Sequence, residues 1–369
     1  MIVNKSFKYR MYPTKEQETF LINTFGCCRF IYNKMLEDKI KHYKLTGELL
    51  HNYPAQYKEL YPFLKKVDSL ALIGAQNALQ IAYDNFFEKR ANFPRFKSKR
   101  KSKQSYTTYN IHSSKDTIRI ENKKIRLPKI GFIKIKYHRP IPLEYKIKNA
   151  TITKNPSGKY YVSVCVEYEY EHPTPILNKD NSIGLDYSSP DFYVDNQGKK
   201  PNYPKYFRKA EEKLTKEQRH LSHMVEGSKN WEKQRIKVAR CYEKVSNQRR
   251  DWLHKLSYYF AETYDYVFVE DIDLRAMAGT LKLGKSTNDN GFGFFRTFVE
   301  YKMKDKGKVF HKIDKWYPSS KTCHHCNYIK ADLTIDDREW ICPECHNIID
   351  RDWNSAINIL NQGFKELKI

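Results

Sequence analysis

The spacing of apolar residues divides the first half of the chain into a strand, a helical region and a set of short strands. Residues 2–10 alternate apolar and polar side chains, as a half-buried strand does. From Pro13 to about residue 90 the pattern is helical, and Asp68 or Ser69 can cap the last helix. Residues 111–170 alternate again. We therefore expect an antiparallel barrel or sandwich that includes the first strand, with the helices as an insertion.

A different pattern follows Pro173 and Pro175, which mark a linker and the main domain boundary. Buried strands are expected at 183–186, 192–195, 266–270 and 309–316. A helical region is expected over 205–260, with a turn at 227–230. A second helix should follow a flexible stretch around 284–293, and a last helix should begin near Asp352. Strands and helices that alternate in this way build α/β layers.

The charge composition indicates that the protein binds a polyanion. The 369 residues include 67 Lys and Arg against 43 Asp and Glu, a net charge of +24, and 40% are hydrophobic. This apolar content argues against a disordered chain, and the charge fits nucleic acid better than a merely solubilising surface. No run approaches the roughly 18–20 apolar residues of a membrane span. The first residues lack the apolar core of a signal peptide, so we expect a cytosolic protein.

Four of the eight cysteines form two pairs with metal-ligand spacing. Two residues separate Cys323 from Cys326 and Cys342 from Cys345, and fifteen residues lie between the pairs. Two such knuckles close into one tetrahedral zinc site, in which four thiolates leave no position open for catalysis. The sequence therefore predicts one structural Zn²⁺ rather than disulfides, which are rare in the cytosol. Neighbouring histidines that could replace a cysteine ligand are His324, His325 and His346.

Three carboxylates lie where α/β proteins carry their active sites. Asp186 and Glu270 end two of the expected strands, and Asp352 stands at the start of the last helix. The carboxyl ends of such strands converge on one edge of the sheet, and hard oxygen ligands suit Mg²⁺. Two such ions can clamp an in-line attack on a phosphodiester. Each acid alone is more often a turn former or a helix cap, so the prediction rests on the three together.

A basic segment with interleaved aromatic residues follows the expected helices. Cations contact phosphates and aromatic rings stack on unpaired bases, although a solvated loop is the commoner state of such a run. The candidate nucleic-acid contacts are Lys89, Arg90, Arg95, Lys97, Lys99, Arg100, Lys101, Lys103 and Tyr106.

Motifs along nearly the whole chain resemble the TnpB family, transposon-encoded RNA-guided nucleases related to type V CRISPR effectors. They are YRMYPT at 9–14, FPRFK at 93–97, GLD at 184–186, VED at 269–271, YPSSKTC at 317–323 and DRDWNSA at 350–356. The resemblance implies a catalytic Asp, Glu and Asp, which by motif position are Asp186, Glu270 and Asp352. Two departures leave these acids intact: Ser188 replaces a frequent Gly, and Phe292 stands where Trp is usual.

The resemblance also implies a multidomain α+β fold. An antiparallel β-barrel wedge domain would be followed by a RuvC-like, RNase H-type α/β nuclease core with an inserted zinc ribbon. The implied ranges are 1–10 and 105–172 for the wedge, 11–104 for a helical recognition domain, 178–320 and 347–369 for the nuclease core, and 321–346 for the zinc-ribbon target-strand loading module.

The activity implied by the resemblance is RNA-guided cleavage of DNA beside a short adjacent motif, by two-metal-ion hydrolysis. Its partners would be a guide RNA and a double- or single-stranded DNA target, and its cofactors two Mg²⁺ and one structural Zn²⁺. A prokaryotic cytoplasmic, nucleoid-associated location would follow. Two alternatives stay open: a guided binder or repressor that does not cleave, which the intact acids disfavour, and a conventional DNA transposase. On oligomeric state the sequence is silent.

Overall fold

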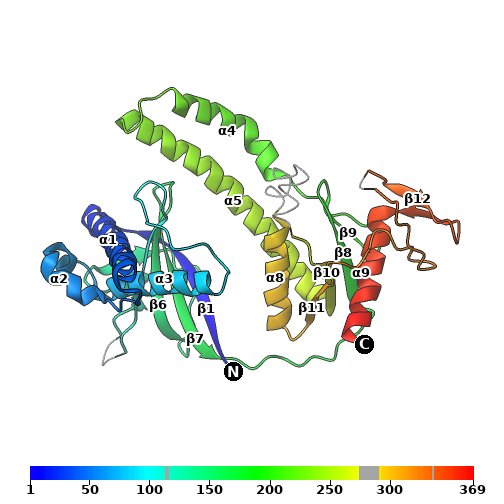
Figure 1. The fold of residues 1–369 in the computed structure, drawn as a ribbon, viewed down its shortest axis with the longest axis horizontal. Coiled ribbons are helices and arrows are strands. Elements are labelled where there is room, and N and C mark those ends of the chain that lie inside the picture. Colours follow the sequence, from blue (N-terminus) through cyan, green and yellow to red (C-terminus); the bar gives the residue numbers. More distant parts are fainter. Residues whose placement is uncertain (113–115, 274–290, 335) are drawn as a thin grey trace. The chain divides into compact units, whose positions relative to one another are not determined.

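The chain folds into two compact units, Met1–Tyr170 and Glu171–Ile369. The computed structural model describes residues 1–112, 116–273, 291–334 and 336–369 (Figure 1). The division falls just before Pro173 and Pro175. Residues 284–290 of the expected flexible stretch lie outside the described residues. Within the described residues, none of the helices has the length and hydropathy that a membrane crossing requires.

Seven antiparallel strands form the sheet of the first unit, in the order β2-β6-β7-β1-β5-β4-β3. Their bounds are β1 Ile2–Tyr12, β2 Gln104–Tyr109, β3 Arg119–Glu121, β4 Lys124–Leu127, β5 Gly131–Ile135, β6 Lys146–Lys154 and β7 Tyr160–Glu169. The predicted first strand lies inside this sheet, because β1 pairs with β7 along its length and with β5 at its end. The described pairing ends at β2 and β3 and does not close the sheet into a ring.

The helices of the first unit lie between β1 and β2 in the sequence, as expected. Their bounds are α1 Lys15–Thr46, η1 Pro54–Gln56, α2 Tyr57–Leu60, η2 Pro62–Lys66 and α3 Ser69–Phe87. Thr14 and Gln17 form a capping box at the start of α1, and Gly47 ends it with a φ of 73°. The side chain of Asp68 caps α3, which confirms one of the two predicted caps. The helices share one core with the inward face of the sheet.

A four-stranded mixed sheet, in the order β11-β10-β8-β9, organises the second unit. Its strands are β8 Ser182–Ser188, β9 Phe192–Asp195, β10 Tyr266–Glu270 and β11 Val309–Ile313. β10 runs parallel to β8 and β11, whereas β9 runs antiparallel to β8. β11 is shorter than the expected 309–316, because the Asp314 carboxylate accepts the Trp316 amide at 2.9 Å and forms a turn.

Helices cover both faces of this sheet. The remaining elements are α4 Tyr206–Ser222, α5 Lys229–Thr263, α8 Phe292–Asp305, β12 Glu339–Ile341, β13 Ile348–Asp350 and α9 Arg351–Leu367. α5 and α8 share a core with the face of Leu185 and Val269. α9 packs on the opposite face, against Phe268 (Figure 1).

Two glycines allow α9 to approach the sheet closely. A Cβ at Gly184 of β8 would lie 2.3 Å from the carbonyl oxygen of Ala356 in α9. A Cβ at Gly363 of α9 would lie 2.0 Å from the Phe268 ring of β10. Both distances are below any real contact, so the helix lies against β8 and β10 only because these positions lack a side chain. This contact fixes the height of the first turn of α9 above the sheet.

We expect Gly184→Ala to destabilise the second unit by about 1–3 kcal/mol, because the added methyl must push α9 away from β8. All five Trp residues belong to this unit, so tryptophan fluorescence during urea unfolding reports on it alone. The control is Gly26→Ala in α1, where a Cβ meets nothing within 4 Å; its unfolding is followed by circular dichroism, because the first unit has no Trp. A tryptophan transition that stays unchanged in Gly184→Ala would contradict the close packing.

Candidate active site

Asp186 and Glu270 lie side by side at one edge of the mixed sheet. Val269 pairs with Leu185 in the parallel register of β10 and β8, so the next residues of the two strands, Glu270 and Asp186, come opposite each other. Side chains alternate along a strand, so both share the face of Gly184 and Phe268, two residues earlier, which α9 covers. The sheet therefore brings two of the three predicted acids together on its α9 face.

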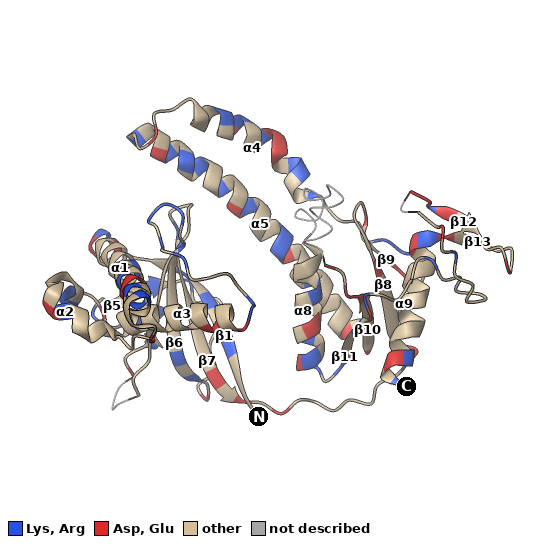
Figure 2. Cartoon of the chain, viewed as in Figure 1, with Lys and Arg blue, Asp and Glu red and all other residues tan. Residues whose placement is uncertain are grey.

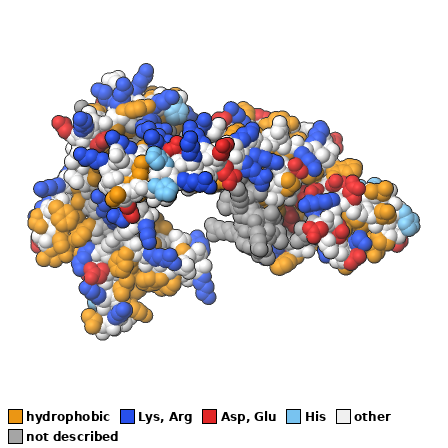
Figure 3. Space-filling view, turned by 90° about the horizontal axis from the view of Figure 1, so that it is seen from above, with side chains coloured by type: hydrophobic (Ala, Val, Ile, Leu, Met, Phe, Trp, Pro, Cys, Tyr) orange, Lys and Arg blue, Asp and Glu red, His pale blue; other side chains and the backbone are white. Residues whose placement is uncertain are grey.

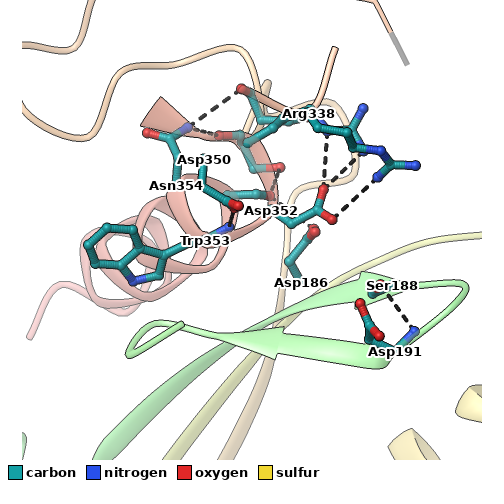
Figure 4. Close-up of polar contacts among 12 residues, drawn as sticks. Asp186, Ser188, Asp191, Arg338, Asp350, Asp352, Trp353 and Asn354 are labelled. Atoms are coloured by element: carbon teal, nitrogen blue, oxygen red, sulfur yellow. Dashed lines mark hydrogen bonds and ion pairs between the residues drawn. The ribbon is translucent and has the colours of Figure 1, made fainter. Parts of the chain in front are cut away.

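The third acid comes from the first turn of α9. Asp350 caps this helix, and its carboxylate accepts the Trp353 amide at 2.8 Å. Asp352 follows inside the turn, and in Figure 4 its carboxylate points toward that of Asp186. The Ser355 hydroxyl, one turn further along α9, donates to Asp186 Oδ1 at 2.9 Å. The structure thus places Asp186, Glu270 and Asp352 at one edge, from three different elements.

Burial and neighbouring carboxylates disfavour the ionisation of Asp186. Burial raises the pKa of Asp186 well above its usual range, and the charges of Glu270 and Asp352 raise it further, while Ser355 and Arg351 oppose the shift. Burial also raises the pKa of Glu270. Half-buried acids that repel one another are a donor set suited to a hard cation, because its charge would relieve that repulsion.

Arginine side chains form ion pairs with Asp352 and hydrogen bonds with the backbone at the end of β10. Asp352 pairs with Arg351 at 3.0 Å and with Arg338 at 3.4 Å (Figure 4). Arg296 of α8 donates to the carbonyl oxygens of Glu270 and Ile272, at 3.2 and 3.1 Å. The acids are more loosely grouped than the four cysteines. Among the described residues, the cysteines form the one group of three or more His, Cys, Asp or Glu whose ligand atoms are close enough to share an ion.

Sequence reasoning did not single out these supporting residues. Ser355 and Arg351 belong to the motif at 350–356, so their position near Asp352 in the sequence could have identified them as site residues. Arg338 and Arg296 had no such signal, because they reach the site only through the packing of β12 and α8.

The four cysteines gather as the spacing predicts. Their sulfur atoms all lie within 4.8 Å of one another, with 3.6 Å between Cys323 and Cys345 and 3.5 Å between Cys326 and Cys342. A disulfide needs about 2.05 Å, whereas sulfurs bound tetrahedrally at about 2.3 Å from zinc lie about 3.8 Å apart. The spacing of these sulfurs fits a four-thiolate zinc site.

The backbone around the cysteines repeats in the two knuckles. The residue after each second cysteine is left-handed: Asn327 has a φ of 63° and His346 a φ of 58°. His324 is not part of the cluster, since its Nδ1 lies 2.9 Å from Asn354 Oδ1 of α9. Apart from the cysteines, the buried core among the described residues of this segment consists of Leu333, Trp340 and Ile349. A metal ion held by the cysteines would supply much of the folding energy of so small a core.

The basic segment is mostly exposed, with two exceptions that correct the predicted contacts. Tyr106 is only 6% exposed and packs on Phe25, so its ring cannot stack on a base. The Lys97 ammonium lies 3.7 Å from the Tyr32 ring centroid, and its backbone is bonded to Asn33, which gives it a structural role. The remaining candidates are exposed: Lys89, Arg90, Arg95, Lys99, Arg100, Lys101 and Lys103.

Comparisons with known proteins agree with the motifs. A family described as "Probable transposase" (OrfB_IS605) matches residues 163–281, and "Cas12f1-like, TNB domain" matches residues 292–359. A "Helix-turn-helix domain" of the same OrfB_IS605 group matches residues 1–48, which here form β1 and the single helix α1.

Two relatives resemble the chain over nearly its full length. A Streptomyces pristinaespiralis protein named "Putative RNA-guided DNA endonuclease" is 33% identical, over 98% of this chain and 90% of its own. InsQ of Escherichia coli K12, which bears the same description, is 27% identical over 97% and 92%. The chain therefore belongs to the TnpB family.

The solved structures include one with a similar fold. The Cas12f1 chain of a complex with sgRNA and target DNA aligns over 98% of this chain and 99% of its own, with a TM-score of 0.57 and 11% identity. At this identity the likeness concerns the fold alone. The protein is thus a mixed α+β protein with a Cas12f-like fold, an antiparallel sheet, a mixed sheet and a C-terminal four-cysteine cluster.

We expect one tightly held Zn²⁺ per chain. Cys342→Ser should release it and unfold residues 321–346 while the first unit stays folded, because that segment has almost no core of its own. Elemental analysis of the purified protein gives the stoichiometry. Cys241→Ser, which removes a cysteine of α5 outside the cluster, should keep the metal. Folded wild-type protein without zinc would contradict the assignment.

Asp186→Asn should stabilise the metal-free protein at neutral pH. The folded-state pKa of Asp186 lies above the unfolded value of about 3.9, so ionised Asp186 destabilises the fold as the pH rises through that window. The gain should disappear below about pH 4, where the carboxyl is protonated in both states. Thermal unfolding against pH measures it, in a buffer without Mg²⁺ and without a chelator that would remove zinc from the cysteine cluster. Asp191→Asn, which changes a half-buried acid paired with Lys200, should show no gain. A destabilised Asp186→Asn at pH 7 would refute the repulsion.

Proposed function

We propose that this protein is an RNA-guided DNA endonuclease that cuts DNA at the Asp186–Glu270–Asp352 edge. The observation that carries the proposal is the convergence of these acids, from β8, β10 and α9, in a member of the TnpB family. Full-length relatives are named for this activity. The Cas12f1 complex with sgRNA and target DNA supports the proposal through its fold.

Asp186, Glu270 and Asp352 are the residues that would hold Mg²⁺, since their carboxylates fit a hard cation. Bound Mg²⁺ would supply Lewis-acid stabilisation of a phosphodiester under attack by water. The protein's own contribution is orientation: Ser355 holds one oxygen of Asp186, and Arg296 fixes the backbone at Glu270. Arg338 and Arg351 neutralise Asp352, a role that a bound Mg²⁺ would take over.

The domain roles follow from the same proposal. The mixed sheet with α5, α8 and α9 would be the RuvC-like core, at 178–320 and 347–369. The four-cysteine segment 321–346 would be a zinc ribbon that loads the target strand. In the first unit, the antiparallel sheet would be the wedge, at 1–10 and 105–172, with 11–104 as the helical recognition domain.

Positive charge is concentrated on the first unit, where we expect much of the nucleic acid to bind. Met1–Tyr170 contains 33 Lys and Arg against 14 Asp and Glu, a net +19, whereas Glu171–Ile369 contains 34 against 29, a net +5. Lys and Arg are spread over many elements, while acidic residues are frequent around β12 and β13 (Figure 2). In the view of Figure 3, Lys and Arg side chains lie in groups among apolar and other residues.

Part of this charge lies on the outward face of the first sheet. Lys8 and Arg10 of β1 lie 4.7 and 5.4 Å from the Tyr161 ring centroid of β7, and Arg10 is 5.5 Å from the ring of Tyr12. Such contacts hold long cationic side chains in place. We expect this face to contact phosphates, as we do separately for the exposed cations of residues 89–103.

Two other functions make different demands on the protein. A guided binder or repressor would need the basic surfaces but not the three acids. A conventional transposase would join DNA strands and would need no RNA. The preserved carboxylates favour cleavage over binding alone, and the RNA requirement separates a guided nuclease from a transposase.

We expect cleavage of double-stranded DNA only where it pairs with the guide and carries the adjacent motif. Omitting or scrambling the RNA should abolish cutting, since guide pairing supplies the specificity. Asp186→Ala, Glu270→Ala and Asp352→Ala should each abolish Mg²⁺-dependent cleavage while keeping guide and target binding, because the basic surfaces are untouched. Gel assays of cleavage and binding measure the two effects separately.

Asp350→Asn is the matched control for these variants. It removes an acid two residues from Asp352 but keeps the oxygen that caps α9, so cleavage should stay near the wild-type rate. If Asp350 proved essential and Asp352 dispensable, the third acid would be wrongly placed. Sequence-independent cutting by RNA-free protein would contradict the guided mechanism.

A further inference from the structure

A row of polar side chains is buried on α9, where a helix packed on a sheet usually presents apolar residues. Asn354, Ser355 and Asn358 are 0%, 1% and 3% exposed. Buried polar groups need hydrogen-bond partners, and these three find theirs largely in one segment, Ser319–His324, which leads into the first zinc knuckle.

Backbone groups of this segment are clamped onto α9. Asn354 Nδ2 donates to the Thr322 carbonyl at 2.8 Å, and the His324 amide donates to Asn354 Oδ1 at 2.9 Å. Asn358 Nδ2 donates to the carbonyls of Thr322 and Ser319, at 2.6 and 2.8 Å. Cys323 lies between two of the clamped residues, so a metal ion held by Cys323 also fixes the position of Ser319.

Ser355 lies between this segment and the acid edge. Its Oγ is 2.9 Å from Asp186 Oδ1 and 3.0 Å from Ser319 Oγ. An ionised carboxylate can only accept. The Ser355 hydroxyl is the donor toward both Asp186 Oδ1 and Ser319 Oγ. Ser355 is therefore the side chain that links Ser319 to the carboxylate.

We propose that Ser319 and Ser355 are positioning residues that transmit the metal-bound state of the cysteine cluster to Asp186. This rests on the proposed function, in which Asp186 holds a divalent ion. With zinc bound, Ser319 stays on α9 and keeps the Ser355 hydroxyl directed at the carboxylate. Without zinc, Ser319 recedes, and the Ser355 hydroxyl can turn to a carbonyl of its own helix, as serines in helices do. Asp186 then loses the hydrogen bond that orients it.

The test measures Mn²⁺ binding to the full chain by electron paramagnetic resonance, with the cleavage rate against Mg²⁺ concentration as a second readout. Asp186→Ala defines the signal that belongs to the acid edge. Ser355→Ala and Ser319→Ala should each weaken Mn²⁺ binding, by about 10- to 100-fold for Ser355, as removal of a hydrogen bond to a metal ligand does. Ser355→Thr, which keeps the hydroxyl, and Ser320→Ala, the neighbouring serine, should bind Mn²⁺ as the wild type does.

A double-mutant cycle tests the transmission itself. Cys342→Ser should weaken Mn²⁺ binding strongly in the wild-type background and little in Ser355→Ala, because both changes break the same connection. Additive effects, or an unchanged Mn²⁺ affinity in Ser355→Ala, would overturn the proposal while leaving the nuclease assignment intact. Mn²⁺ binding that is unaffected by Asp186→Ala would instead overturn the metal site, and the connection with it.

Discussion

The close contact of α9 with β8 is the constraint on which the site depends. Gly184 and Gly363 remove the two side chains that would hold the helix away from the sheet. Because the helix lies that close, its first turn stands over the end of β8, and Asp352 joins Asp186 and Glu270 from a distant part of the sequence. The same contact buries Asn354, Ser355 and Asn358, which must then find polar partners. Those partners belong to the segment that leads into the cysteine cluster. One packing contact therefore connects the sheet, the three acids and the four-cysteine segment 321–346.

Electrostatics explains why this arrangement needs support from around it. Burial, and then the charges of Glu270 and Asp352, raise the pKa of Asp186, and the protein offsets this with the Ser355 hydroxyl and with Arg351. Sites that bind cations often carry such a stability cost, because the arrangement that suits the ion is unfavourable without it. Arg338 belongs to the four-cysteine segment 321–346, so this segment contributes to the acid edge by charge as well as by hydrogen bonding.

Much of this architecture could be predicted from the sequence, because local patterns carry it. Alternation predicted β1, the Asp68 cap predicted the start of α3, and paired cysteines predicted a cluster that needs no knowledge of the fold. Tyr106 was misjudged, since an aromatic residue in a basic run looks the same whether its ring faces solvent or the core. Arg338 and Arg296 could not be found, because their role depends on which distant backbone they reach. The closeness of α9 to β8 was likewise invisible, since a glycine in a strand has several explanations.

The proposed activity requires that the acids of β8, β10 and α9 form one metal-binding edge. Crystals of the protein soaked with Mn²⁺ test it most directly, because anomalous scattering locates the ions without reference to activity. We expect Mn²⁺ beside Asp186, with oxygen ligands from Glu270 and Asp352. The Asp352 carboxylate should then no longer be paired with Arg338 and Arg351. Mn²⁺ found only elsewhere on the protein, with Asp352 still paired to both arginines, would contradict it.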